Sequence, residues 1–194
     1  MIDEKKISEW VNESYRTACE KGFHEEELSV AHMLMLVLTE VSEVVDADRK
    51  GRRIRDLGMF EDSMRTKDFK YSFTTYVKDS VEDELSDVVI RICDTCGALG
   101  IEPYLVDSMQ KEFNEIFGAF PLCERCFVLS RILCDVDDDV IVDEANPKCV
   151  QSVLSSALEF VLCMCEDTGI DIERHVELKM RYNDMRPYKN GKSY

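Results

Sequence analysis

The stretch from Ser29 to Asp48, SVAHMLMLVLTEVSEVVDAD, decides the fold class. Its apolar residues fall on nearly every face of a helix, so a helix here must be buried almost all round. Glu40 and Glu43 interrupt the apolar run and lie three residues apart, which places both side chains on one helix face. The stretch therefore predicts a core helix that carries two acidic groups.

The remainder of the chain also favours helices. Only 8 Gly and 4 Pro are present, too few for the turns of a many-stranded protein. Apolar spacing predicts helices over residues 3–21, 80–97, 100–117, 126–136, 148–167 and 171–185. Ser80 and Asp83 are expected to cap the second of these. Residues 49–78, with a β-leaning stretch from Tyr71 to Val77, are expected to form a long functional loop. The prediction is an all-α helical bundle.

Charge and composition exclude several classes of function. The formal net charge of −16 over 194 residues argues against nucleic-acid binding, which needs clustered Lys and Arg. A nucleotide enzyme of this charge would need a divalent metal and a local basic patch. No signal peptide is predicted, and the longest apolar run, Val30 to Leu38, is too short to span a membrane. Nine cysteines without framework spacing indicate reduced thiols in the cytoplasm.

A second acidic pair accompanies the first. Glu84 and Asp87 also lie three apart in a predicted helix, so two neighbouring helices can direct four carboxylates to one spot. Buried carboxylates are costly unless they are paired or bind a metal, and clustered oxygen ligands suit Mg²⁺ or Mn²⁺. Most Glu-x-x-Glu pairs are solvated, but the apolar neighbours of Glu40 and Glu43 argue against that here. A di-iron bundle would need Glu-x-x-His, which neither His24 nor His32 provides.

Three ordered motifs resemble one protein family. Thr39-Glu40-Val-Ser-Glu43, followed by Glu84-Leu-Ser-Asp87, resembles the Glu-x-x-Glu … Glu-x-x-Asp signature of MazG-like all-α pyrophosphatases. The basic turn DRKGR at 48–52 resembles that of one branch of the family, and KMRYNDMRPYKNGK at 179–192 resembles its C-terminal tail. The similarity covers roughly residues 20–96 and 169–194. One departure is Thr39, where many members have a second glutamate.

The resemblance implies an activity and a set of site residues. Relatives such as dimeric dUTPase, dCTP pyrophosphatase and phosphoribosyl-ATP pyrophosphatase point to hydrolysis of an NTP or dNTP to the monophosphate and pyrophosphate, a housecleaning reaction of the nucleotide pool. Glu40, Glu43, Glu84 and Asp87 would hold Mg²⁺, or Mn²⁺, with Glu40 and Glu43 as catalytic groups and Glu43 as the favoured base. Residues expected to bind the nucleoside triphosphate are Lys179, Tyr182, Asn183, Arg186, Lys189, Lys192, Arg49, Arg52 and His24. The alternative for Arg49 and Arg52 is a structural role, in which their positive charges stabilise the C-terminal end of the preceding helix through its dipole.

The second half of the chain resembles the first. A shift of 69 positions lays Val81 on Val150 and Gly100 on Gly169, and a shift of 91 lays Val37 on Val128. The second copy lacks the four carboxylates. Under these shifts, the positions that align with Glu40, Glu43, Glu84 and Asp87 hold Arg131, Cys134, Val153 and Ser156. We therefore expect a MazG-like unit over residues 1–118 and a degenerate second copy over 119–194, forming one globule and a pseudo-dimer within the chain. Further homo-oligomerisation is compatible with this scheme.

Two other motifs resemble metal sites but depart from the required patterns. The acidic run from Asp135 to Asp139 lacks the Gly and Glu of a calcium loop, with Val140 and Asn146 at those positions. Two Cys-x-x-Cys pairs, at 93–96 and 123–126, have a separation longer than a usual zinc ribbon, and the first lies in a predicted helix. The leading interpretation remains a nucleotide pyrophosphohydrolase. The alternatives are phosphoribosyl-ATP pyrophosphatase-like activity and a catalytically inactive nucleotide-binding or interaction module.

Overall fold

The computed structural model describes residues 2–54, 56–105, 109–137 and 147–191, and within these ranges it contains helices and no strand. The all-α prediction is confirmed. The α-helices are α1 (Glu4–Glu20), α2 (Val30–Arg49), α3 (Gly58–Met64), α4 (Phe69–Tyr76), α5 (Val81–Leu99), α6 (Met109–Phe117), α7 (Leu122–Leu133), α9 (Pro147–Thr168) and α10 (Ile172–Asp184), and a 3₁₀ turn, η1 (Tyr188–Gly191), follows.

Local capping fixes the two helices that matter most for the site. The Ser29 hydroxyl accepts a hydrogen bond from the His32 N–H and starts α2, and Ser80 caps α5 in the same way through the Asp83 N–H. Helix α5 ends at Gly100, whose φ of 64° is a left-handed conformation that glycine adopts without strain. The predicted start and end of both helices therefore agree with the structure to within about two residues.

Two of the predicted segments are wrong. The supposed loop over residues 49–78 contains a helical hairpin, α3 and α4, because Phe60, Phe69 and Phe73 bury their rings against α10 and this packing overrides the β-leaning sequence. Helix α6 begins at Met109 rather than after Gly100. Residues 101–105 are not helical, and two hydrogen bonds tie them to α9: the Tyr104 N–H donates to the Ser155 hydroxyl, and the Gln151 side chain donates to the Glu102 carbonyl.

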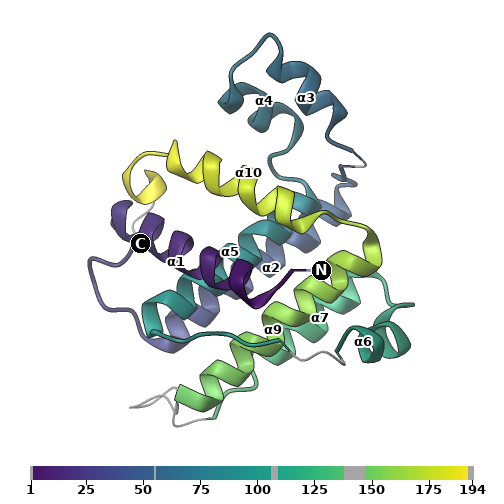
Figure 1. Ribbon diagram of the computed structural model, residues 1–194. Coiled ribbons are helices and arrows are strands. Elements are labelled where there is room, and N and C mark those ends of the chain that lie inside the picture. The colour runs from purple at the N-terminus through teal and green to yellow at the C-terminus, as the bar shows by residue number, and fades with distance from the viewer. Residues whose placement is uncertain (1, 55, 106–108, 138–146, 192–194) are drawn as a thin grey trace.

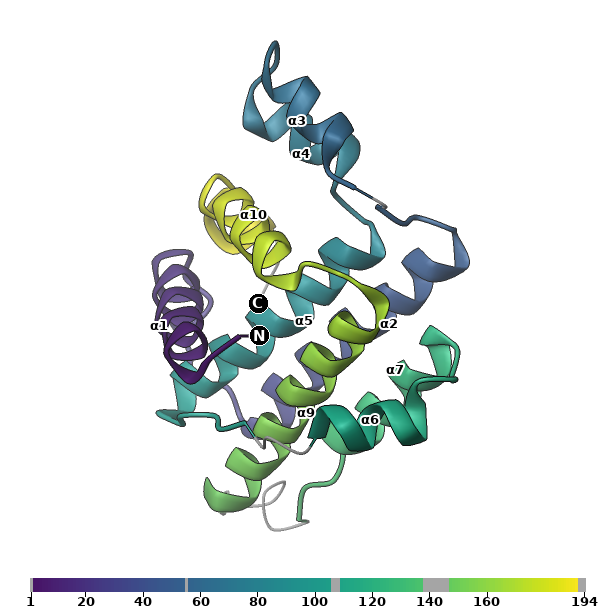
Figure 2. The ribbon, with the colours of Figure 1, turned by 45° about the vertical axis from the view of Figure 1, so that its right-hand side comes forward.

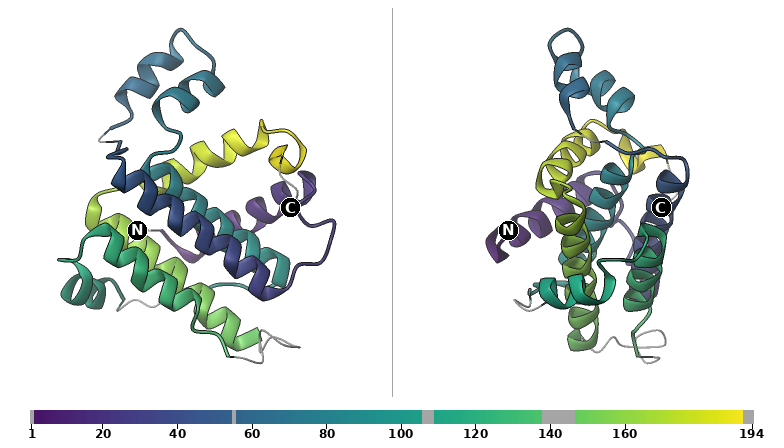
Figure 3. Two further views of the ribbon diagram at one scale, coloured as in Figure 1. Left: turned by 180° about the vertical axis from the view of Figure 1, so that it is seen from behind. Right: turned by 90° about the vertical axis from the view of Figure 1, so that its right-hand side faces the viewer.

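The helices form three layers around α5 (Figure 1, Figure 3). Helices α2 and α7 form an outer layer, α5 and α9 the middle layer, and α1 and α10 cover the far side of α5. Val37, Val44, Leu85, Val88 and Ile92 are fully buried where α2 meets α5. The α3–α4 hairpin projects from one end of the bundle and contacts α10 through a small aromatic cluster of its own (Figure 2). Helix α5 therefore touches most of the molecule.

The helix contacts repeat in pairs along the chain. Helix α2 packs on α5, and α7 packs on α9; α10 packs on α5, and α6 packs on α9. The two pairs join through contacts between α2 and α7 and between α5 and α9. Exchanging α2, α5 and α6 for α7, α9 and α10 leaves this list of contacts unchanged.

Helix α9 is long and apolar enough, from Lys148 to Thr168, to cross a membrane by length and composition alone. In the structure 67% of its most apolar window is buried inside the bundle. Leu154, Leu158, Val161 and Cys165 are fully enclosed by neighbouring helices. This is the burial of a core helix in a soluble protein.

Gly97 allows α1 and α5 to approach closely. A methyl group at Gly97 would lie 2.9 Å from Cγ of Tyr15 and 3.3 Å from the Val11 carbonyl oxygen. Helix propensity alone predicts that Gly97→Ala stabilises the protein by about 1 kcal/mol. We expect the clash to dominate, so that the variant is destabilised by roughly 1–3 kcal/mol. Urea unfolding followed by circular dichroism measures the change, and a raised midpoint would contradict the close approach.

Candidate functional site

A cavity of about 510 Å³ opens between α1, α2, α5 and α10. Helix α2 contributes Glu40 and Glu43, and α5 contributes Glu84 and Asp87. The opposite walls carry side chains of α1 and α10 and of the segment before α5. The cavity thus combines residues from the beginning, middle and end of the chain, and its remaining lining residues include Ser14, Thr17, Lys21, Thr39, Lys78, Asp79, Arg91, Asp94, Lys179, Asn183 and Arg186.

Three of the four predicted ligands come together. Glu40, Glu84 and Asp87 each offer a carboxylate oxygen, and these atoms lie within 4.8 Å of one another. Two unit negative charges at that separation repel by roughly 3 kcal/mol even at an effective dielectric of 20. Glu43 also lines the cavity, but its side chain is exposed and lies outside this close group. Among the described residues no other set of His, Cys, Asp or Glu side chains meets in this way.

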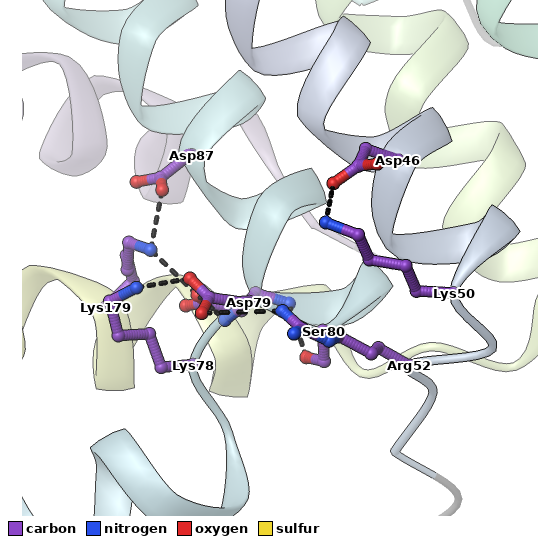
Figure 4. A network of polar contacts seen from close by, with 9 residues as sticks. Asp46, Lys50, Arg52, Lys78, Asp79, Ser80, Asp87 and Lys179 are labelled. Atoms are coloured by element: carbon purple, nitrogen blue, oxygen red, sulfur yellow. Dashed lines mark hydrogen bonds and ion pairs between the residues drawn. The ribbon is translucent and has the colours of Figure 1, made fainter.

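A buried lysine enters the acidic cluster from α10. The ammonium of Lys179 lies 2.5 Å from Asp87 Oδ2 (Figure 4). It lies 2.9 Å from Asp83 Oδ2, and the lysine side chain is only 5% exposed. Asp83 lies behind the cavity wall, where Oδ2 also accepts a hydrogen bond from the Asp79 N–H at 3.0 Å. The other oxygen of Asp83, Oδ1, is buried and has no hydrogen-bond partner. Lys179 therefore bridges a cavity carboxylate and a carboxylate of the capping turn.

Burial and mutual repulsion perturb the acids of this cluster. Burial, together with the charges of Asp87, Asp83 and Glu43, raises the pKa of Glu84 to about 8 even though Lys179 opposes the shift. Burial raises the pKa of Asp83 to about 6, again against the effect of Lys179. Burial alone would lower the pKa of Lys179, but the carboxylates of Asp87 and Asp83 outweigh it and raise that pKa. The cluster holds more negative charge than it can easily keep ionised.

A second positively charged side chain, Arg91 of α5, contacts the cluster. Arg91 Nη2 lies 3.4 Å from Glu40 Oε1, and Nη1 of the same side chain lies 3.5 Å from Asp94 Oδ2. Asp94 is also paired with His24, at 2.6 Å from Nε2. His24 lies in a small recess that adjoins the main cavity and shares Phe23, Leu36, Arg91 and Asp94 with it. Charged and aromatic side chains therefore link this recess with the main cavity.

The predicted substrate-binding residues divide into two groups. Lys179, Asn183 and Arg186 line the cavity, and His24 lies in the adjoining recess. The other described ones lie elsewhere: Tyr182 stacks on Phe73, Lys189 pairs with Glu25, Arg52 pairs with Asp79, and Arg49 is an exposed residue at the end of α2. Lys192 lies outside the described residues. The tail is instead tied to α1, because the Lys21 ammonium donates to the carbonyls of Asp184 and Arg186.

Several cavity residues were not predicted from the sequence. Arg91 and Asp94 share α5 with Glu84 and Asp87 but are not part of the Glu-x-x-Asp motif. Asp83, behind the cavity wall, was predicted only as part of the helix cap. Lys78 and Asp79 belong to the segment before α5 and pair with each other (Figure 4). Asp79 has a φ of 61°, a conformation in which Asp is more often found than most residues. The one available signal was the polar character of α5 at positions 91 and 94, within an otherwise apolar helix.

The cysteine motifs do not form a metal site in the described part of the chain. All nine cysteines are free. Burial raises the pKa of both Cys96 and Cys126 to about 12, so these thiols stay protonated at neutral pH. In the acidic run predicted not to bind calcium, Asp138 and Asp139 lie outside the described residues, and so do Val140 and Asn146. The carboxylate cluster is the candidate site.

Comparison of the chain with known proteins finds no matching family model, no matching curated protein and no matching solved structure.

The raised pKa of Glu84 predicts a pH dependence of the metal-free protein. Because this pKa is about 8 in the folded chain and 4.5 is the ordinary value, Glu84 favours the fold at low pH, and that contribution is lost as the pH rises between these values. In EDTA we expect the free energy of unfolding to fall over this range. Glu84→Gln should remove much of the fall, measured by urea unfolding at several pH values. An unchanged pH profile would contradict the burial of this carboxyl group.

Proposed function

We propose that the protein is a divalent-metal-dependent nucleoside triphosphate pyrophosphohydrolase of the MazG-like kind, acting in the cytoplasm. The observation that carries the proposal is the convergence of Glu40, Glu84 and Asp87 from α2 and α5 in a cavity that also holds chain cations. All four acidic residues of the Glu-x-x-Glu and Glu-x-x-Asp motifs line this cavity. The cavity is also large enough to take much of a nucleotide.

The donor set fits a hard divalent cation. Three carboxylates within 4.8 Å supply only oxygen ligands, which suit Mg²⁺ or Mn²⁺ better than softer metals. Glu40, Glu84 and Asp87 would hold the ion, with Glu43 at the rim. When bound, such an ion neutralises phosphate charge and makes a water molecule more acidic. The other proposed roles, which are binding and orienting the substrate and accepting a proton, belong to side chains of the protein.

The chain's own residues can bind and orient a triphosphate. Arg186 and Asn183 line the wall opposite the carboxylates, and the Asn183 Oδ1 is buried without a hydrogen-bond partner. Lys21 holds the backbone at Arg186 and so positions this guanidinium. Arginine suits phosphate because its planar donors match two oxygens. Glu43, exposed at the rim, is the group proposed to accept a proton from the attacking water.

The repeated helix contacts support a duplicated chain with one working site. Under the shift of 69 positions, Arg91 corresponds to Phe160, Tyr182 to Phe113 and Arg186 to Phe117. These three phenylalanines pack together, with ring centroids of Phe113 and Phe117 at 5.0 and 5.3 Å from that of Phe160. Arg91 and Arg186 line the polar cavity, whereas their counterparts Phe160 and Phe117 belong to an aromatic cluster. In this scheme α10 of the second unit completes the site of the first.

A catalytically inactive nucleotide-binding module remains the second candidate. It is favoured by the ion pairs of Lys179 and Arg91 with two of the three close carboxylates, and by Thr39 in place of a glutamate. The two candidates differ in one measurement, the release of pyrophosphate. A screen of common NTPs, dNTPs and phosphoribosyl-ATP with excess Mg²⁺ separates them and also tests the phosphoribosyl-ATP pyrophosphatase alternative.

Loss of single carboxylates should abolish most of the activity. Glu40→Gln, Glu84→Gln and Asp87→Asn are each expected to lower kcat/KM at least about a hundredfold, because each removes charge that organises the metal and the water. Glu43→Gln should lower kcat more than it raises KM if Glu43 is the base. Asp46→Asn is the matched control, since Asp46 lies on α2 but pairs with Lys50 outside the cavity (Figure 4). Near-native turnover in all four variants would exclude this site.

The duplication predicts one substrate site per chain. Isothermal titration of the full chain with Mg²⁺ and a non-hydrolysable analogue of the best substrate should give a stoichiometry of one. Arg186→Gln should weaken this binding, because Arg186 lines the cavity. Substitution of Phe117, its counterpart, by Leu should leave the nucleotide affinity within about threefold, since roughly volume-conserving apolar changes are tolerated in cores. Two equivalent sites per chain would refute the scheme.

A further inference from the structure

Two positively charged side chains neutralise the metal-free cluster of Glu40, Glu84 and Asp87. Each of them pairs with one carboxylate of this close group and with one carboxylate outside it. Arg91 pairs with Glu40 of the close group and with Asp94 outside it. Lys179 pairs with Asp87 of the close group and with Asp83 outside it. Lys179 is the more buried of the two and has the shorter contact, so it is the stronger competitor for a ligand oxygen.

Asp83 is built to retain Lys179. It lies in the first turn of α5, 1% exposed, and its Oδ2 already receives the ammonium and the Asp79 N–H. Its Oδ1 is a buried acceptor with no partner, which is unusual because buried polar atoms are nearly always satisfied. An ammonium has three N–H donors. A lysine that leaves Asp87 can therefore keep its contact with Asp83 and form a new one there.

We propose that Lys179 is a displaceable counter-ion: it pairs with Asp87 in the metal-free protein and is retained by Asp83 when a divalent cation takes the oxygens of Glu40, Glu84 and Asp87. The inference rests on the proposed metal site. It assigns Asp83 as a positioning residue and makes Lys179 a brake on metal binding. Lys179 released from Asp87 is then available to a phosphate oxygen of the substrate, while Asp83 prevents an uncompensated buried charge.

The affinity for Mn²⁺ tests the competition without any measurement of activity. Lys179→Met should tighten Mn²⁺ binding at least about tenfold, because the competing ammonium is gone. Lys78→Met is the matched control: Lys78 also lines the cavity, but it pairs with Asp79 and with none of the three carboxylates. Its effect should stay below about threefold, because its charge is partly exposed to solvent and already paired with Asp79. Equal effects of the two substitutions would overturn the proposal.

A double-mutant cycle tests the role of Asp83. Asp83→Asn should weaken Mn²⁺ binding in the otherwise unaltered protein, because Lys179 then loses the partner that retains it. The same substitution should have little effect in the Lys179→Met background, which gives a strong coupling between the two sites. Additive effects would mean that Asp83 acts only as a nearby charge and would refute its positioning role.

A direct measurement on the unaltered protein remains decisive if Lys179→Met does not fold. The ¹H–¹⁵N signal of the Lys179 ammonium, assigned with Lys179→Arg, should shift when Mg²⁺ is added to saturation. An unchanged signal while Mg²⁺ binds would overturn the inference and leave the proposed function intact. Failure of the protein to bind either Mg²⁺ or Mn²⁺ would instead overturn the proposed function together with the inference.

Discussion

The burial of acidic side chains along α5 is the constraint on which the site and much of the fold depend. Asp83 and Glu84 are almost wholly enclosed, and an ionised carboxylate in such a place is tolerable only with a partner. The partners come from outside the helix. Lys179 of α10 reaches Asp83 from the far end of the chain, and the backbone N–H of Ile54 donates to the buried Glu82. Helix α5 thereby fixes both α10 and the linker that leads to the α3–α4 hairpin.

The α3–α4 hairpin holds α10 in place through aromatic contacts. Tyr182 stacks on Phe73 with ring centroids 4.6 Å apart, and Arg181 lies over the ring of Phe69 at 4.1 Å. The Lys179 ammonium itself lies 5.9 Å from the centroid of the Phe73 ring. One face of α10 therefore packs on aromatic rings, while Lys179, Asn183 and Arg186 are directed to the cavity side. Tyr182, which the family resemblance assigned to the substrate, serves this packing in the structure.

Residue spacing was sufficient for some of these features and not for others. The core position of α2, the Ser80 cap of α5 and the meeting of Glu40 with Glu84 and Asp87 follow from periodicity and local chemistry, which the sequence contains directly. The hairpin was missed because its aromatic residues complete their burial only against α10, about a hundred positions later in the chain. The role of Lys179 was missed for the same reason. A basic residue in a tail motif does not reveal that it will be buried against Asp83.

The charge of the cavity connects the acidic composition with the proposed chemistry. The chain as a whole carries a formal −16, yet six carboxylates and five Lys or Arg side chains line this cavity, so it is nearly neutral. Such a surface neither attracts nor strongly repels a triphosphate. Under the proposed function, one bound divalent cation makes the formal charge of the lining positive, and only then does the cavity favour a polyanion. Substrate affinity would follow metal occupancy for this electrostatic reason alone, without any change in the helices.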